Sequence, residues 1–289
     1  MGEVRCVAQS RSVLGEGPLW DQRRGRLYWF DIKGRLLHWF EPGAGAVEQR
    51  RLAVQVSAAA LRSGGGMLAA SERGLELLDP QSGALELIEA KESDLDGFRS
   101  NDGKIDVRGV FWWSVMDEDG GRRPGRVYRK APGAPSRRVL EGIHIPNTIS
   151  TTPDGRTLYL ADSALGTLYA FRIRDSGDLG ERTVFATTAE GEGAPDGSAV
   201  DEEGCVWNAQ WGGGRVVRYT SDGRIDRIVA MPVSQPSSCA FGGPEMRTLY
   251  VTSARDGLGD EALSREPEAG GLFAFEAGVR GMKLPLFAG

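Results

Sequence analysis

Gly155-Arg-Thr-Leu-Tyr-Leu160 is followed, after a short turn, by Gly166-Thr-Leu-Tyr-Ala-Phe171, and this phrase decides the fold. Each run is a turn glycine followed by apolar, β-branched or aromatic residues, which is the pattern of a β-strand. The same phrase returns along the whole chain, with copies that begin at Gly25, Gly66, Gly109, Gly204 and Met246. The chain therefore consists of a repeated β unit.

The spacing of the repeats is nearly constant. Between the anchors Gly25, Gly65, Gly109, Gly155, Gly204 and Met246 the successive spacings are 40, 44, 46, 49 and 42 residues. A period of about 40 to 50 residues with several strands per unit is typical of β-propellers. We expect an all-β, six-bladed β-propeller that forms one domain over residues 1–289, with a helical turn near residues 260–264. A β-sandwich does not explain this even spacing.

Composition excludes several classes of protein. The 289 residues include 35 Lys and Arg and 40 Asp and Glu, a formal net charge of −5, whereas nucleic-acid binders need a basic surface. The sequence has no apolar run of the length of a membrane helix and no secretory signal. The three cysteines, at positions 6, 205 and 239, have no CxxC spacing. We expect a reduced, cytoplasmic monomer without nucleic-acid or membrane partners.

One repeat position carries oxygen-bearing side chains in four of the six copies. Counting back eight or nine residues from the anchors gives Glu16, Asn101, Asn147 and Asp196, with Ser57 and Ser238 or Cys239 in the other two copies. The innermost strand of each blade lines the central channel, so equivalent positions converge there. Each residue is also a common turn residue, but two carboxylates and two amides together suit a hard divalent cation. The pattern predicts a metal site.

Several motifs carry a resemblance to a known family. They are Leu14-Gly-Glu-Gly-Pro-Leu-Trp20, Arg99-Ser-Asn-Asp-Gly-Lys-Ile-Asp106, Pro146-Asn147, Pro195-Asp-Gly197 and Phe241-Gly-Gly-Pro244. Through them the chain resembles the SMP-30/gluconolactonase/regucalcin-like six-bladed propellers, and in its C-terminal part the bacterial sugar-lactonase branch. The resemblance implies one divalent cation (Ca, Mg, Mn, Zn or Fe(II)) held by Glu16, Asn147 and Asp196.

The resemblance also implies a substrate site. Arg99 and Asn101 match substrate-binding positions, and a further acidic contact falls in Asp117-Glu-Asp119, assigned to Asp119 with Glu118 as the alternative. The chain departs from the family at Thr148, where glycine is frequent, and at Ser114-Val115-Met116, where Gly-Thr-Met is frequent. The second departure changes the wall beside the substrate and leaves the sugar open.

The implied activity is the hydrolysis of a sugar (aldono-)lactone to the sugar acid. A bound divalent ion polarises the carbonyl and activates water, and Asp196 is the candidate catalytic base. Two other functions remain open: an aryl-ester or phosphotriester hydrolase with the same metal site, and a non-catalytic binding module in which the ion only holds the blades together. Arg99 and Asn101 argue against the binding module, because an ion that only holds blades needs no substrate contacts.

Overall fold

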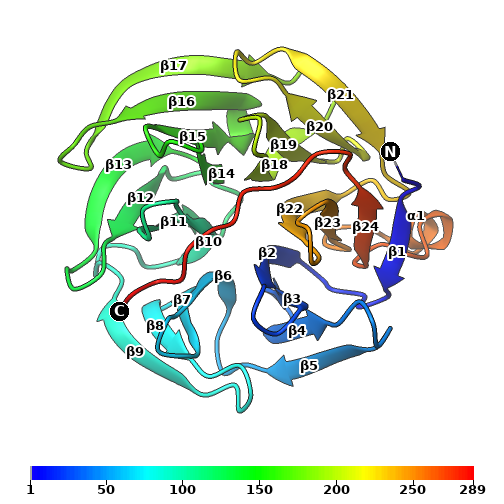
Figure 1. The fold of residues 1–289 in the computed structure, drawn as a ribbon, viewed down its shortest axis with the longest axis horizontal. Helices are drawn as coiled ribbons and strands as arrows, with labels where there is room; N and C mark the ends of the chain where they lie inside the picture. The colour runs from blue at the N-terminus through cyan, green and yellow to red at the C-terminus, as the bar shows by residue number, and fades with distance from the viewer. Residues whose placement is uncertain (1) are drawn as a thin grey trace.

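The computed structural model describes residues 2–289 and consists almost entirely of β-strands. Six four-stranded antiparallel sheets surround a central channel as blades (Figure 1), which confirms the six-bladed β-propeller. The helices in this range are the short 3₁₀ turn η1 (Ser163–Leu165) and α1 (Asp260–Arg265), the latter where a helical turn was expected. Neither is long and apolar enough to cross a membrane.

Each blade is a meander whose first strand lies innermost. Blade one contains β2 (Gly15–Asp21), β3 (Arg26–Asp31), β4 (Leu36–Phe40) and β5 (Val47–Arg51). Blade two contains β6 (Val56–Leu61), β7 (Met67–Ser71), β8 (Gly74–Leu78) and β9 (Leu85–Ala90). Blade three contains β10 (Phe98–Ile105), β11 (Phe111–Asp117), β12 (Gly125–Lys130) and β13 (Arg137–Ile143).

The second half of the ring follows the same plan. Blade four contains β14 (Pro146–Thr151), β15 (Thr157–Asp162), β16 (Thr167–Ile173) and β17 (Leu179–Thr187). Blade five contains β18 (Ala194–Val200), β19 (Val206–Trp211), β20 (Arg215–Tyr219) and β21 (Ile225–Ala230). Blade six combines β22 (Pro236–Gly242), β23 (Thr248–Ser253) and β24 (Leu272–Glu276) with β1 (Arg5–Ala8) from the N-terminus.

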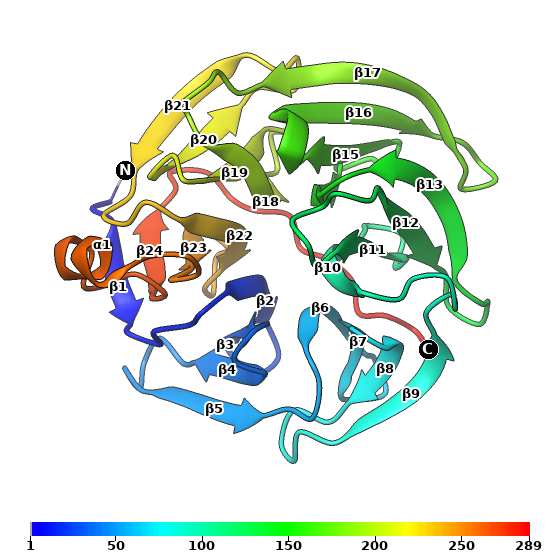
Figure 2. The same ribbon diagram turned by 180° about the vertical axis from the view of Figure 1, so that it is seen from behind.

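Strand β1 closes the ring. It pairs antiparallel with β24, with Arg5 opposite Ala274 and Cys6 opposite Phe273, so the last blade contains both ends of the repeat array (Figure 2). Closure satisfies the backbone groups at the edge of β24, which otherwise offers an unpaired strand.

Large apolar side chains fill the space between neighbouring blades. Trp29, Trp112 and Trp207 lie on the second strands of three blades and are at most 1% exposed. One apolar cluster joins Leu68 of blade two to Phe111 of blade three. At about 25 cal/mol per Å², an aromatic side chain that buries about 200 Å² contributes roughly 5 kcal/mol. This packing holds the inner strands in place around the channel.

Each inner strand is irregular near its start. The pairing register between the first and second strands shifts in every blade, for example between Glu16 and Leu19 and between Asn147 and Ser150. A β-bulge turns a side chain out of the regular alternation. Glycine is required beside the first of these shifts, because Gly17 has φ 58° and a Cβ there would lie 2.3 Å from the carbonyl oxygen of Ser57.

Candidate active site

The four residues of the shared repeat position lie near the starts of four inner strands. Glu16 is on β2, Asn101 on β10, Asn147 on β14 and Asp196 on β18, and the relative exposures of Glu16, Asn147 and Asp196 are 9%, 5% and 6%. The Nδ2 of Asn101 donates hydrogen bonds to Asn147 Oδ1 at 2.9 Å and to the carbonyl oxygen of Pro146 at 3.0 Å. The amide pair therefore joins blades three and four at the channel.

The carboxylates of this group destabilise one another. Burial raises the pKa of Glu16 to about 8, with a further contribution from the negative charge of Asp102. Burial also raises the pKa of Asp196 well above its usual value, and the charges of Glu16 and Asp102 act in the same direction. Burying carboxylates close together is costly unless a cation neutralises them. The donor set is all oxygen and fits a hard divalent cation.

No repeat pattern singles out Asp102 and Lys104, yet both lie inside the channel. Asp102 is buried and its carboxylate accepts hydrogen bonds from the backbone N–H groups of Gly103 and Ile149, both at 2.8 Å. The Nζ of Lys104 donates to the carbonyl oxygens of Ser198 and of Cys239, the latter at 3.4 Å. Lys104 thus connects blade three with blades five and six across the channel, and its charge partly offsets the buried carboxylates. Burial lowers its pKa, while Asp102 opposes that change.

Arg99 lies beside Asn101 with capacity left for a ligand. It is 8% exposed, and its Nη1 donates to the carbonyl oxygen of Ser100 and to Asn101 Oδ1, both at 2.8 Å. It forms no ion pair of 4 Å or less with any residue in the range 2–289. Burial lowers the pKa of Arg99, and the negative charges of Glu118 and Glu16 oppose this. The remaining guanidinium N–H groups can therefore donate to an acceptor in the channel.

The structure separates the two candidates for the acidic substrate contact. The side chain of Asp119 is 68% exposed and forms an ion pair with Arg122 at 2.7 Å, within its own hairpin. Glu118 instead accepts a hydrogen bond from Gln55 Nε2 of the neighbouring blade at 3.3 Å, and its charge acts on Arg99. Of the two, Glu118 is the one whose charge acts on Arg99.

Two aspartates on second strands hold the chain just before the site residues. Asp31, at the end of β3, accepts hydrogen bonds from the backbone N–H groups of Val13 and Leu14, two to three residues before Glu16. Asp162, at the end of β15, does the same for His144 and Ile145, just before Asn147. Both carboxylates therefore act as positioning residues. Because they occupy equivalent places in the repeat, they hold the backbone before Glu16 and before Asn147 in the same way.

Thr148, directly after Asn147, has an unusual backbone conformation. Its φ is 60°, in the left-handed region that β-branched residues rarely adopt. Its Oγ1 donates to the carbonyl oxygen of Asp196 at 2.5 Å and accepts from Asn208 Nδ2 at 3.0 Å. These buried contacts tie blade four to blade five and compensate for the strained conformation.

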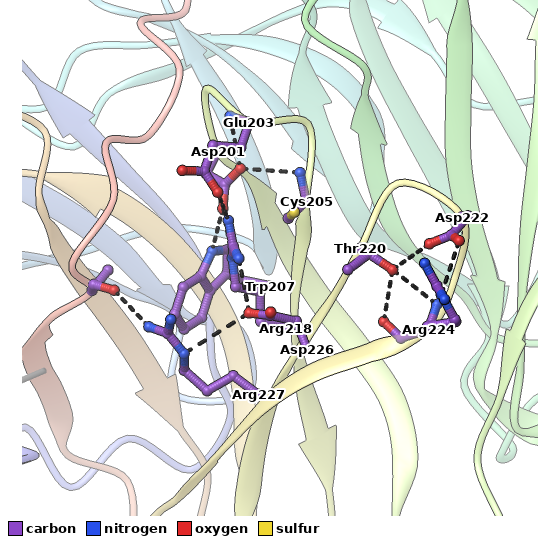
Figure 3. A network of polar contacts seen from close by, with 11 residues as sticks. Asp201, Glu203, Cys205, Trp207, Arg218, Thr220, Asp222, Arg224, Asp226 and Arg227 are labelled. Carbon is purple, nitrogen blue, oxygen red and sulfur yellow. Dashed lines mark hydrogen bonds and ion pairs between the residues drawn. The ribbon is translucent and has the colours of Figure 1, made fainter.

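Asp201, Glu203 and Cys205 form a second acidic group (Figure 3). It follows the end of β18, whereas Asp196 lies near the start of that strand. Its carboxylates face the guanidinium of Arg218, which contacts Asp201 Oδ2 at 2.8 Å and Glu203 Oε2 at 2.5 Å. A cation already neutralises them, so this group is a poor metal site. Asp201 also accepts from Trp207 Nε1 at 2.9 Å.

The equivalent residues of blade three show that this arrangement is structural. There Asp106 accepts from Trp112 Nε1 at 2.8 Å and from the backbone N–H of Val110 at 2.9 Å, without a neighbouring glutamate or cysteine. The aspartate and tryptophan thus stabilise the same turn in two blades.

Comparison with known proteins supports the resemblance found in the sequence. Residues 14–255 match the model of the SMP-30/gluconolactonase/LRE-like region. The chain is 34% identical to a 6-deoxy-6-sulfogluconolactonase of Pseudomonas putida, with 99% of each chain covered. It is 38% identical to an L-arabinolactonase of Azospirillum brasilense, with 100% of this chain and 96% of the relative covered.

A solved structure is similar to this protein over nearly the whole chain. The calcium-binding protein regucalcin of Agrobacterium tumefaciens superimposes with a TM-score of 0.93 at 35% identity, covering 99% of this chain and 97% of the other. The match extends over all six blades and includes the strands that bear the channel residues. The chain belongs to the SMP-30/gluconolactonase/LRE-like family.

Proposed function

We propose that this protein is a metal-dependent sugar lactonase that hydrolyses an aldonolactone to the sugar acid. The observation that carries the proposal is the hydrogen-bonded pair of Asn101 and Asn147, which places the Arg99–Asn101 unit directly beside the oxygen donors Asn147, Glu16 and Asp196. The names of the relatives, two of them lactonases, support the same class of reaction.

Glu16, Asn147 and Asp196 would hold one divalent cation, which when bound polarises the lactone carbonyl and lowers the pKa of water. Asp196 is the proposed base, because its carboxylate belongs to the proposed donor set and can accept a proton from the attacking water. The water oxygen bonds to the carbonyl carbon, the ring C–O bond breaks, and a proton goes to the ring oxygen. Water is consumed and a hydroxy acid is formed.

Arg99 and Asn101 orient the substrate. The unused N–H groups of Arg99 are donors for the lactone oxygens, and Asn101 keeps the guanidinium in place through its Oδ1. Holding the lactone ring in one orientation lowers the entropic part of the activation barrier, and so raises the rate. Glu118, whose charge acts on Arg99, is the proposed acceptor for a ring hydroxyl.

Positive and negative charges offset one another around Arg99. The carboxylates that act on Arg99 are Glu16, Glu118, Asp196 and Asp256. Lys33 is already paired with Asp256 at 2.6 Å. The cation that Glu16 and Asp196 would hold, together with Lys33 and Arg99 itself, offsets these carboxylates, so charge alone does not separate neutral from charged lactones.

The polar mouth argues for a sugar over an aryl ester or phosphotriester. Gln55 and Gln235 immediately precede β6 and β22, at the end of the channel where the site residues lie. Together with Glu118 they provide hydroxyl partners, whereas an aryl leaving group needs an apolar surface. A non-catalytic module in which the ion only holds the blades together does not explain why Arg99 lies beside the proposed metal ligands.

The test is proton release from glucono-, galactono-, xylono- and arabinono-lactones after chelation and after re-addition of single divalent ions. We expect hydrolysis to vanish with the chelator and to return with one ion. An Asp196→Asn variant that still binds metal should be slowed at least a hundred-fold. Full activity of that variant would disprove the role of Asp196 as base, and spontaneous rates with every ion would disprove the lactonase proposal.

A further inference from the structure

Trp211 lies beside the start of the inner strand that bears Asp196. In the three blades with the proposed metal ligands, the residue before the ligand pairs with Asp31, Asp162 or Gln210 on the second strand. The next residues along the chain are Ile32, Ser163 and Trp211. Trp211 therefore has the same place relative to Asp196 that Ser163 has relative to Asn147.

This repeat position contacts the site in the blades where its residue is polar. Ser163 accepts a hydrogen bond from Asn147 Nδ2 at 2.9 Å and donates to the carbonyl oxygen of Pro195 at 2.6 Å. Glu118 directly follows β11 as Ser163 follows β15, and its charge acts on Arg99. Side chains at this position thus surround the entrance to the channel, and in blade five that side chain is an indole.

The indole extends from blade five over blade six. Ala209, two residues earlier on the same face of β19, belongs to an apolar cluster that these two blades share. Trp211 packs against the next apolar cluster, which contains Leu14, Ile32 and Ala254. Leu14 lies two residues before Glu16, so Trp211 joins the strand start with Asp196 to the strand start with Glu16. The inner strands β18, β22 and β2 follow one another around the channel (Figure 1).

Part of the indole remains accessible. Trp211 is partly exposed, whereas Ile32 and Ala254 of the same cluster are 1% and 0% exposed. Trp113 Nε1 is buried without a partner, but Trp211 Nε1, also without a hydrogen bond to any residue in the range 2–289, is not buried. The apolar surface that blades five, six and one offer at the entrance is therefore this ring.

The backbone around Trp211 is closely packed. A Cβ on Gly213 would lie 2.3 Å from the carbonyl oxygen of Glu192, so the turn after β19 approaches the segment before β18 closely. Gln210 is buried and accepts a hydrogen bond from Arg215 Nε at 2.6 Å. The indole is thus held in place before a ligand arrives, which reduces the entropy lost on binding.

The ring of a sugar lactone has two faces, and the configuration at each carbon decides which face carries the hydroxyl and which the C–H group. A flat apolar surface packs closely on C–H groups. A hydroxyl pressed against it loses its water without gaining a hydrogen bond, which costs free energy.

We propose that Trp211 determines specificity by packing against one face of the lactone ring, so that the protein prefers lactones without a hydroxyl on that face. Gln55 and Glu118, which are hydrogen-bonded to each other in blades two and three, are acceptors for hydroxyls on the other face. This inference rests on the proposed lactonase function and adds to it the selection of a configuration at the ring carbons.

The kinetic test compares the fastest lactone of the panel above with its epimer at C3, whose hydroxyl lies on the other face of the ring. For galactono-1,4-lactone the epimer is gulono-1,4-lactone. Trp211→Leu keeps an apolar side chain against Ala254 but removes the flat ring. We expect the ratio of kcat/KM between the two epimers to move about ten-fold toward one in this variant, and to stay within about three-fold of wild type in Trp211→Phe.

Trp20→Leu is the matched control. Trp20 is another partly exposed tryptophan, near the end of β2, where it stacks on Tyr250 with 6.0 Å between the ring centroids. This variant should keep the wild-type ratio. Equal rates for the two epimers in wild type, or a loss in Trp211→Leu that is the same for both, would overturn the proposal, because a purely structural role lowers both rates alike.

A binding measurement separates this inference from the lactonase proposal. The lactams of the four sugar acids have an N–H in place of the ring oxygen and resist hydrolysis. In protein labelled with 5-fluorotryptophan, the fluorine resonance of Trp211 is identified by its loss in Trp211→Phe. We expect it to shift saturably with at least one lactam, while the resonance of Trp20 stays unchanged.

The two proposals then fail in different ways. A shift at Trp211 in a protein that hydrolyses none of the lactones would disprove the lactonase proposal and leave the contact with the ring. Lactone hydrolysis without any shift at Trp211 would disprove the role of Trp211 and leave the lactonase proposal.

Discussion

Asn101 donates a hydrogen bond of 2.9 Å from Nδ2 to Oδ1 of Asn147, and this contact links the proposed substrate residues to the proposed metal ligands. On one side Arg99 donates to Asn101 Oδ1 at 2.8 Å. On the other side Asn147 donates to Ser163 Oγ at 2.9 Å, and Ser163 donates to the carbonyl oxygen of Pro195 at 2.6 Å. The series runs from Arg99 to the residue before Asp196, so the orientation of each amide depends on its neighbour.

Breaking this series at Asn101 should impair both substrate and metal binding. Asn101→Leu keeps the approximate volume but removes the acceptor for Arg99 and the donor to Asn147. We expect kcat/KM for the preferred lactone to fall about ten- to hundred-fold, because the guanidinium loses its orientation. Metal affinity, measured by calorimetry, should fall as well. A variant with unchanged kcat/KM would show that Asn101 does not orient the substrate.

Glu118 and Asp119 should differ in their effect on substrate binding. Glu118→Gln removes the charge that faces Arg99, and we expect KM to rise about ten-fold, consistent with loss of a charge-assisted hydrogen bond. Asp119→Asn should leave the kinetics unchanged, because that side chain is 68% exposed and paired with Arg122. Steady-state kinetics of both variants test this prediction. A larger rise in KM for Asp119→Asn than for Glu118→Gln would identify Asp119 as the substrate contact.

Metal binding should depend on Glu16 and not on Asp201. Glu16→Gln should weaken the binding of Ca²⁺ or Mn²⁺ by an order of magnitude or more, since it removes a proposed ligand. Asp201→Asn should keep the same affinity and a stoichiometry of one ion. It should instead lower the free energy of unfolding by about 3 kcal/mol, because it breaks the buried contact with Arg218. A loss of metal binding in Asp201→Asn would assign the ion to the cluster of Figure 3.

His38 should make the protein sensitive to mild acid. It is 1% exposed, its ring lies 5.0 Å from that of Trp29, and burial lowers its pKa to about 4 from the 6.5 of an exposed histidine. Below pH 6.5 the unfolded chain takes up a proton that the folded protein excludes, so stability falls as the pH drops from 6.5 to about 4. The loss specific to His38 is roughly 3 kcal/mol.

Denaturant unfolding of wild type and His38→Phe across this pH range measures that contribution. The difference in unfolding free energy between the two proteins should change with pH only between about 4 and 6.5. A difference independent of pH would mean that folding does not change the pKa of His38.

Thr148 should matter through its hydroxyl rather than its shape. Thr148→Val retains the β-branch but leaves Asp196 O and Asn208 Nδ2 without that partner, and we expect about 1 to 3 kcal/mol lower stability. Thr148→Ser keeps the hydroxyl and should stay within about 1 kcal/mol of wild type. Thermal denaturation compares the two, and equal losses would assign the effect to packing.

The repeat explains why so much of the fold and site could be predicted. A phrase such as Gly155–Leu160 followed by Gly166–Phe171 specifies a local strand pair, and its even recurrence predicts six blades without knowledge of contacts between them. The same logic selected Glu16, Asn101, Asn147 and Asp196, because equivalent repeat positions meet at one end of the channel. The structure places all four near the starts of inner strands, at that end.

Other features depended on contacts between blades. Spacing cannot distinguish the adjacent residues Glu118 and Asp119. In the structure Asp119 is exposed and forms an ion pair with Arg122. Asp102 and Lys104 lie within the irregular part of β10, where a bulge breaks the simple alternation of side chains, so periodicity could not tell which of them faces the channel.

The sequence alone determined the number of blades, the family and the repeat position that bears the oxygen donors, because periodicity and short motifs are properties of the linear chain. Only the tertiary structure decided that Lys104 crosses the channel, that Thr148 holds Asp196, and that the C-terminal segment is hydrogen-bonded to Met246 and to Leu61. These features join residues that lie far apart in the sequence. Their geometry is set by the packing of whole blades and by ring closure through β1.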